Sequence, residues 1–294
     1  MTKFALIYHS ADLDGMCSAA IMKKFFNTRL ENKNTQTDFI GWNYGEELPI
    51  LDQYTNIIMA DISFPADVMK ELHRTKNLIW IDHHKAIIEE LEPLKIPGLR
   101  DTSLSACELT WKYLFPEADV HPMVELLGKY DTFRHKDTPE EETVNKFQYG
   151  AQVKMQTYDE VYEYLEDWAI SDFQEFKYMG ENVLDYLRKD INQVLKTGLK
   201  LEFRYNSDKV KVIAINKPGV NPAVIGINYH NEGYDALINF SISGQNLTLT
   251  IYNANKKVDV SKIAKQFGGG GHPGASGFRI PLSDLNNFLN KHKY

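Results

Sequence analysis

The chain has 294 residues, of which 43% are hydrophobic and 25% are charged, and its formal net charge is −7. This length can bury a sizeable core in one large domain or two smaller ones, and the composition is that of an ordinary globular protein. The two cysteines, Cys17 and Cys107, have no CxxC partner, which argues against a disulfide framework or a zinc ribbon.

The first residues turn polar too quickly for a signal peptide, and no apolar run approaches membrane length. We therefore expect a soluble cytoplasmic protein without a membrane partner. Residues 201–294 hold 11 Lys and Arg against 6 Asp and Glu, whereas the rest of the chain holds 22 against 34. An acidic first part beside a basic last part suits a cation site and an anion-binding module, although solubility alone can produce such a split.

Short apolar runs alternate with helical patterns at the start of the chain. Residues 4–8, 37–42, 56–60 and 77–81 are predicted to be buried strands, and residues 16–30 and 65–73 are predicted to be helices. A polar group follows nearly every strand. Strands that alternate with helices in this way predict a parallel, doubly wound α/β sheet.

The pattern becomes helical in the middle of the chain and β-rich after Gly198. Helices are predicted at 103–114 and 120–130, a solvated acidic helical connector at 137–175, and one long amphipathic helix at 172–195. Strands are predicted at 199–205, 210–215, 236–241 and 247–252, with helices near 221, 260 and 282–290. We expect a first domain at 1–170, a helical linker at 171–198, and a smaller mixed-sheet α/β domain at 199–294.

The polar residues at the predicted strand ends suit a metal site. Carboxylates and imidazoles without thiolates favour Mn²⁺, with Mg²⁺ or Co²⁺ (or Zn²⁺) as alternatives. The set is large enough for two divalent ions bridged by one Asp, and two metals about 3.5–4 Å apart form a clamp for in-line attack on phosphorus. The simpler alternative is a polar exit from each strand. The candidate residues are His9, Asp12, Asp14, Asp61, Asp82, His83, His84 and Asp131.

A second candidate site lies near the end of the chain, where an amphipathic helix at 258–267 runs into four glycines and a histidine. Successive glycines allow backbone N–H groups to converge on an anion without side chains in the way. A flexible turn is the alternative interpretation. The residues concerned are Gly268, Gly269, Gly270, Gly271 and His272.

These motifs resemble those of the DHH phosphoesterase superfamily with a C-terminal DHHA1 domain. That group includes RecJ-type exonucleases, family II pyrophosphatases, oligoribonucleases with pAp phosphatase activity and cyclic-dinucleotide phosphodiesterases. The resemblance implies metal ligation by six residues, a bridging role for Asp61, contact of His84 with the scissile phosphate, and an orienting role for Asp82. It also implies that the loop Gly268–His272 holds a substrate phosphate. The implied ligands are His9, Asp12, Asp14, Asp61, His83 and Asp131.

The sequence departs from the family pattern at two places. Many members have a Pro-containing spacer of three residues between the first His and the first Asp, whereas only Ser10-Ala11 separates His9 from Asp12. His9 could therefore be a strand-end imidazole bonded to backbone. Relatives also commonly carry an Arg-Ser pair where this chain has Tyr252-Asn253, and Lys217 is a candidate for the missing cation.

The predicted function is hydrolysis of phosphoester bonds in short nucleotides by a hydroxide activated between two metals. The expected substrate is an oligoribonucleotide, pAp or a cyclic or linear dinucleotide. A homodimer remains open. One alternative is a pyrophosphate or polyphosphate hydrolase, and another is a catalytically weak nucleotide-binding module.

Overall fold

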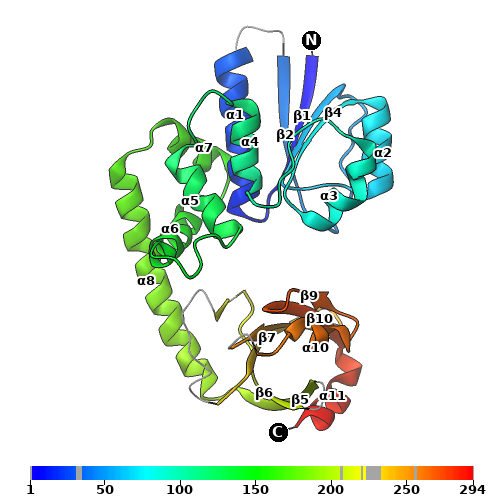
Figure 1. Cartoon of the computed structure of the whole chain (residues 1–294), viewed down its shortest axis with the longest axis vertical. Coiled ribbons are helices and arrows are strands. Elements are labelled where there is room, and N and C mark those ends of the chain that lie inside the picture. The colour runs from blue at the N-terminus through cyan, green and yellow to red at the C-terminus, as the bar shows by residue number, and fades with distance from the viewer. Residues whose placement is uncertain are drawn as a thin grey trace. The chain divides into compact units, whose positions relative to one another are not determined.

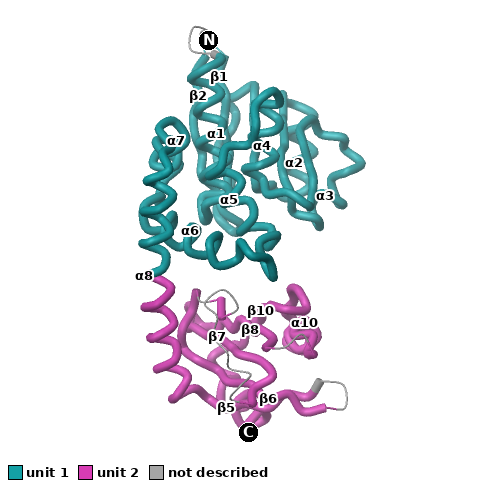
Figure 2. Tube along the Cα trace, turned by 60° about the vertical axis from the view of Figure 1, so that its left-hand side comes forward, with its two compact units in different colours: residues 1–181 teal, residues 182–294 magenta. Residues whose placement is uncertain are grey.

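The computed structural model describes residues 2–30, 35–205, 208–219, 221–222, 233–254 and 257–293. The chain divides into two compact units, Met1–Glu181 and Asn182–Tyr294 (Figure 2). The division falls inside the helix α8 (Ile170–Leu195), which corresponds to the helix predicted at 172–195. Among the described residues, no helix is long and apolar enough to cross a membrane.

Unit 1 is built on a four-stranded parallel sheet (Figure 1). Its strands are β1 (Thr2–His9), β2 (Thr35–Trp42), β3 (Asn56–Ala60) and β4 (Asn77–Ile81), in the spatial order β2-β1-β3-β4. Chain order reverses direction at β1, because β2 lies on one side of it and β3 on the other. In open α/β sheets, ligands bind outside the carboxyl ends of the strands at such a switch point.

The inner strands are apolar on both faces, which explains their continuous hydrophobic runs. Along β1, Leu6 belongs to one buried cluster and Ile7 to another, and Ile58 and Met59 of β3 divide in the same way. Helices cover both faces of the sheet (Figure 1), with α1 and α4 over one face and α2 and α3 over the other. The helices of unit 1 before α8 are α1 (Leu13–Leu30), α2 (Ala66–Thr75), α3 (Lys85–Leu91), the short 3₁₀ helix Glu92–Leu94, α4 (Ala106–Leu114), α5 (Pro122–Asp131), α6 (Glu141–Lys154) and α7 (Tyr158–Glu166).

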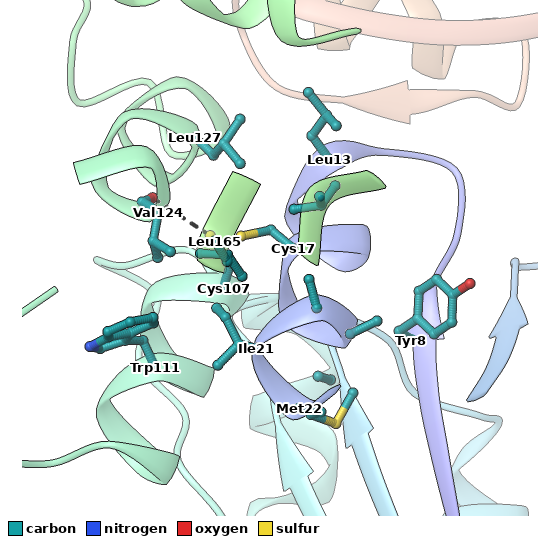
Figure 3. Packing of buried hydrophobic residues seen from close by; sticks show 14 of the residues in the cluster. Tyr8, Leu13, Cys17, Ile21, Met22, Cys107, Trp111, Val124, Leu127 and Leu165 are labelled. Carbon is teal, nitrogen blue, oxygen red and sulfur yellow. Dashed lines mark hydrogen bonds between the residues drawn. The ribbon is translucent and has the colours of Figure 1, made fainter. Parts of the chain in front are cut away.

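Small and aliphatic side chains join α1 to α4 and α5. Figure 3 shows Cys17 and Ile21 of α1 packed beside Cys107 of α4, with Leu127 of α5 in the same cluster. The Cys107 thiol donates to the backbone carbonyl of Val124 at 3.7 Å, and both cysteines are buried free thiols. This apolar packing fixes the first turn of α1, which carries Asp14, and the first turn of α4 at the carboxyl end of the sheet.

The acidic segment predicted to be a solvated connector is helical, but it is not merely solvated. Val144 and Phe147 of α6 and Val161 of α7 are buried in the structure. A Cβ on Gly150 would lie 1.9 Å from the Phe176 carbonyl oxygen, and one on Gly180 would lie 1.7 Å from the Lys146 carbonyl oxygen. These glycines therefore let α6 and α8 approach backbone to backbone, and the acidic residues occupy only the outer faces.

Unit 2 contains a six-stranded mixed sheet in the order β5-β6-β7-β8-β10-β9. Neighbouring strands are antiparallel except β6 and β7, which are parallel. Residues of α10 and α11 close its hydrophobic cluster. The elements are β5 (Leu199–Tyr205), β6 (Asp208–Ile215), β7 (Ala236–Ser243), β8 (Asn246–Asn253), α10 (Val260–Lys265), β9 (Gly270–Gly271), β10 (Ala275–Pro281), the 3₁₀ helix Leu282–Asp284 and α11 (Leu285–His292).

The predicted fold class, a mainly parallel sheet followed by a smaller mixed-sheet α/β region, is confirmed. The sequence patterns missed β10, because its run Ala275–Pro281 begins inside the glycine-rich segment. They also missed the short helix α3, which directly follows the two histidines. The helix predicted to begin near Asn221 falls mostly outside the described residues.

Candidate metal centre

The candidate residues of unit 1 converge at the carboxyl ends of β1, β3 and β4. Three overlapping groups have side-chain ligand atoms that all lie within 4.8 Å of one another. The groups are His9, Asp12 and Asp61; Asp14, His83 and Asp131; and Asp61, His83 and His84. Seven of the eight predicted residues therefore take part in a cluster, and only Asp82 stands outside these groups.

His9 is the last residue of β1 and faces two carboxylates. Its Nδ1 lies 3.1 Å from Asp12 Oδ2 and 3.6 Å from Asp61 Oδ2. The Asp12 carboxylate, and then Asp61, raise the pKa of His9 to about 10 against the opposing effect of burial. The chain can turn this tightly because Gly15 has no side chain: a Cβ there would lie 1.9 Å from the His9 carbonyl oxygen. The short Ser10-Ala11 spacer thus still brings His9 to the cluster.

Asp61 follows β3 and lies at the centre of the cluster. Its Oδ2 faces His9, and its Oδ1 lies 3.3 Å from His83 Nε2 and 4.0 Å from His84 Nδ1. The residue is 1% exposed and has a left-handed backbone with φ 63°. Its N–H donates to the Ile81 carbonyl at 3.0 Å, which ties β3 to β4 at this turn. The two carboxylate oxygens therefore point into different groups.

His83 joins the carboxylates of three different elements. Its Nε2 lies 3.3 Å from Asp61 Oδ1, 3.7 Å from Asp14 Oδ2 and 3.5 Å from Asp131 Oδ2. Asp131 is the last residue of α5. Burial, followed by the charges of Asp14 and Asp61, raises the pKa of the Asp131 carboxyl to about 8.

The N-terminus of α4 supports Asp14. Asp14 Oδ2 accepts a hydrogen bond from the Ala106 N–H, and Oδ1 accepts one from the Cys107 N–H, both at 2.8 Å. The positive end of a helix dipole favours a carboxylate at this position. Burial acts in the opposite direction and raises the pKa of Asp14.

Asp82 lies behind the histidines and has no exposed surface. Its Oδ1 accepts from the backbone N–H of His83 at 2.7 Å, from that of His84 at 3.1 Å, and from His84 Nδ1 at 2.7 Å. Its Oδ2 accepts from Trp80 Nε1 at 3.1 Å. The bond to Asp82 raises the pKa of His84 and engages Nδ1 of an imidazole that is 41% exposed.

The donor set fits a divalent cation. Asp61 Oδ2 and Asp131 Oδ2 are buried and make no hydrogen bond among the described residues. Burial and the neighbouring Asp14 raise the pKa of Asp61 well above its usual range, as expected for carboxylates crowded together without a counterion. Buried carboxylate oxygens and imidazole nitrogens without thiolates match the ligands of hard or intermediate divalent metals.

Several backbone groups of the glycine-rich loop in unit 2 already make hydrogen bonds within that unit. The N–H groups of Gly268 and Gly269 donate to the carbonyls of Lys265 and Ala264 and so end α10. Gly270 and Gly271 form β9, which pairs with β10. The side chain of His272 is exposed, and its backbone N–H donates to the Ala275 carbonyl at 2.9 Å. A cradle of four free glycine N–H groups is therefore not present.

Lys217 and Asn253, the residues named at the second departure from the family pattern, both have partners within unit 2. Lys217 Nζ lies 2.5 Å from Asp190 Oδ2 of α8, so its charge is already paired. Asn253 Nδ2 donates to the carbonyls of Val258 and Pro273, both at 3.1 Å, and so holds the glycine-rich loop in place. Burial raises the pKa of Tyr252, which keeps the phenol neutral.

Sequence reasoning missed the supports of the cluster. Ser105 and Glu108 form a capping box at the N-terminus of α4, and Glu108 also pairs with Arg134. The S-x-x-E pattern at Ser105 was a readable signal for that helix start. Tyr44, whose ring centroid lies 6.2 Å from that of His9, had no comparable signal, because it lies within an ordinary Asn-Tyr-Gly turn.

Comparison with known families gives two matches to this chain. The model of the DHH family N-terminal domain matches residues 3–130, and the model of the DHHA1 domain matches residues 207–293. A curated relative, the uncharacterized protein R106 of Acanthamoeba polyphaga mimivirus, is 26% identical. The match covers 92% of this chain and only 66% of the viral protein, so the chain spans less than two thirds of its length.

Two solved structures have similar folds at low sequence identity. One is the pGpG-specific phosphodiesterase PggH from Vibrio cholerae, with a TM-score of 0.55, 14% identity, and coverage of 99% of this chain and 97% of that one. The other is an exopolyphosphatase-related protein from Bacteroides fragilis, with a TM-score of 0.53, 14% identity, and coverage of 99% and 91%. At this level of identity, both likenesses show the fold.

Proposed function

Because the chain belongs to the DHH family and carries a DHHA1 domain after its DHH domain, we propose that it is a metal-dependent phosphoesterase acting on short nucleotides. The observation that carries the proposal is the cluster at the switch point of the parallel sheet. There, Asp61 directs its two oxygens toward two groups of ligands, one with His9 and one with His83.

In this proposal, two divalent cations occupy the cluster. His9 and Asp12 would hold the first and Asp14, His83 and Asp131 the second, and Asp61, whose two oxygens face both groups, would contribute to each. Such a pair would lower the pKa of a water molecule and neutralise charge on phosphoryl oxygens. Mn²⁺ is our first expectation, because carboxylate and imidazole ligands suit it, with Mg²⁺ or Co²⁺ as alternatives.

Asp82 and Trp80 orient the imidazole of His84, which would contact the substrate. Asp82 fixes the tautomer of His84 by accepting the Nδ1 proton, and Trp80 holds Asp82 in turn. His84 Nε2 is then free to donate a hydrogen bond to a phosphoryl oxygen or to the leaving oxygen. In unit 2, the proposed contact with substrate narrows to Gly270, Gly271 and the exposed imidazole of His272.

Nucleotide phosphoesters are preferred over pyrophosphate or polyphosphate in this proposal because the chain carries a DHHA1 domain. One structurally similar protein is titled a pGpG-specific phosphodiesterase and another an exopolyphosphatase-related protein, so both substrate classes need to be tested. A catalytically weak nucleotide-binding module is the remaining alternative, and a turnover assay separates it from the enzyme.

The test combines a substrate panel with one variant. Wild-type protein with Mn²⁺ is incubated with short RNA, pAp, linear and cyclic dinucleotides, pyrophosphate and polyphosphate, and product release is measured. We expect the fastest hydrolysis for a nucleotide phosphoester. Asp61→Asn keeps the left-handed backbone accessible but removes the bridging charge, so activity should fall by at least about 100-fold while the circular dichroism spectrum is unchanged.

Two outcomes would contradict the proposal. Full activity of Asp61→Asn would exclude Asp61 from the reaction. Failure of the wild type to hydrolyse any panel member, although it binds Mn²⁺ and nucleotide, would favour the binding module.

A further inference from the structure

The loop after β2 carries an aromatic side chain to the edge of the metal centre. The Tyr44 ring centroid lies 6.2 Å from that of His9 and 5.7 Å from that of Trp42, whose ring it meets edge to face. Burial raises the pKa of Tyr44, hydrogen bonds with Ser63 lower it, and the charges of Asp82 and Asp61 raise it. The ring therefore belongs to the surroundings of the cluster.

The side chain of Tyr44 is nonetheless 56% exposed. Its loop is held in place. Asn43 Nδ2 donates to Ser10 Oγ at 3.0 Å, and the Asn43 N–H donates to the Glu46 carboxylate at 3.0 Å. Because Ser10 directly follows His9, these bonds fix the position of the Tyr44 backbone relative to the cluster. A large aromatic ring is thus presented to solvent in a pre-set position beside buried carboxylates.

We propose that Tyr44 stacks on a nucleobase of the substrate and so selects nucleotides over base-free phosphates. This inference rests on the proposed function. Stacking of a base on an aromatic side chain contributes about 1–3 kcal/mol and tolerates different bases, because every base has a π-face. Pyrophosphate and polyphosphate have no such face, and the negative face of an aromatic ring offers nothing to an anion.

The experiment compares a dinucleotide with its abasic counterpart, which keeps the sugar–phosphate backbone without the bases. We expect Tyr44→Ala to lower kcat/KM for the dinucleotide by about 5- to 150-fold, which corresponds to the stacking energy, and to leave the abasic substrate within about twofold. Tyr44→Phe keeps the ring and should retain the activity of the wild type. Tyr178→Ala is the matched control, because Tyr178 is 69% exposed on α8, where no cluster residue lies.

Equilibrium binding gives a second readout that does not need turnover. Calorimetry with AMP and with ribose 5-phosphate, each with Mn²⁺ and with EDTA, should show weaker AMP binding in Tyr44→Ala and unchanged ribose 5-phosphate binding. If the wild type binds AMP through Tyr44 but hydrolyses nothing, the proposed function fails and the stacking role stands. Equal losses for both ligands, or for both substrates, would overturn the stacking role and make Tyr44 a support of His9. An equal loss in Tyr44→Phe would assign the effect to the hydroxyl.

Discussion

At Asp131, the pKa of about 8 connects metal binding to pH. In the metal-free protein, the folded state holds a proton that the unfolded chain has already lost above pH 4, so folding stability falls as the pH rises from about 4 to 8. A divalent cation needs the deprotonated carboxylate and must displace that proton.

We therefore expect the apparent affinity for Mn²⁺ to rise between pH 6 and about 8 as Asp131 loses its proton. It should go on rising toward pH 10, because His9, with a pKa of about 10, must also lose a proton to bind a cation. Calorimetry in two buffers of different ionisation enthalpy should detect proton release on binding at pH 7. Asp131→Asn should bind Mn²⁺ more weakly at every pH and with a smaller pH dependence. An affinity that does not change between pH 6 and 8 would contradict this account.

At the scale of elements, the N-terminus of α4 holds Asp14 in place, and a single mutation can weaken it. Ser105 Oγ accepts from the Glu108 N–H, and the first two N–H groups of the helix, those of Ala106 and Cys107, bind Asp14. We expect Ser105→Ala to lower the free energy of unfolding by about 1 kcal/mol and to weaken Mn²⁺ binding, because the helix end that holds Asp14 frays.

Thr157→Ala is the matched control for that change. Thr157 and Glu160 form the same capping box at the N-terminus of α7, which carries no residue of the cluster. Chemical denaturation should show a similar loss of stability in both variants, and calorimetry should show weaker Mn²⁺ binding in Ser105→Ala alone. A similar loss of affinity in Thr157→Ala would mean that the effect is one of general stability.

The elements also explain how much could be predicted from the sequence. The strand ends were predictable because a buried strand is a continuous apolar run, and the carboxylate that ends it is visible in the sequence at Asp61 and Asp82. The hydrogen bonds of Asp14 to α4 were not predictable, since they join residues 92 and 93 positions apart. The ion pair of Lys217, a candidate cation in the sequence, was not predictable for the same reason: its partner Asp190 lies on another element. Periodicity reports which face of an element is buried, but not which polar group it meets.

At the scale of the whole molecule, the hydrophobic clusters separate by unit. The two clusters on the faces of the parallel sheet contain residues of unit 1, and the third contains residues of unit 2. All predicted metal ligands lie in unit 1. Bound metal should therefore stabilise unit 1 directly and unit 2 only indirectly.

We expect calorimetric unfolding in two transitions, of which Mn²⁺ shifts one. At a Mn²⁺ concentration of about 100 times Kd, the linkage contribution is about 2.7 kcal/mol, or a shift of about 5–10 °C for a unit of this size. Hydrogen exchange would assign the shifted transition to residues 1–181. Asp61→Asn should lose the shift. Equal shifts of both transitions would show that the two cores unfold together.

The backbone of Asp61 has a consequence for the evolution of this chain. A φ of 63° is tolerated by Asp, Asn and Gly, and is strained for nearly every other residue. Asn and Gly are therefore the replacements best tolerated at this position, and both remove the carboxylate charge while preserving the turn. A gene copy released from selection for catalysis should carry Asn or Gly here before other cluster residues decay. Asn or Gly at position 61 would therefore distinguish an inactive copy from an active enzyme on the basis of genome sequences alone.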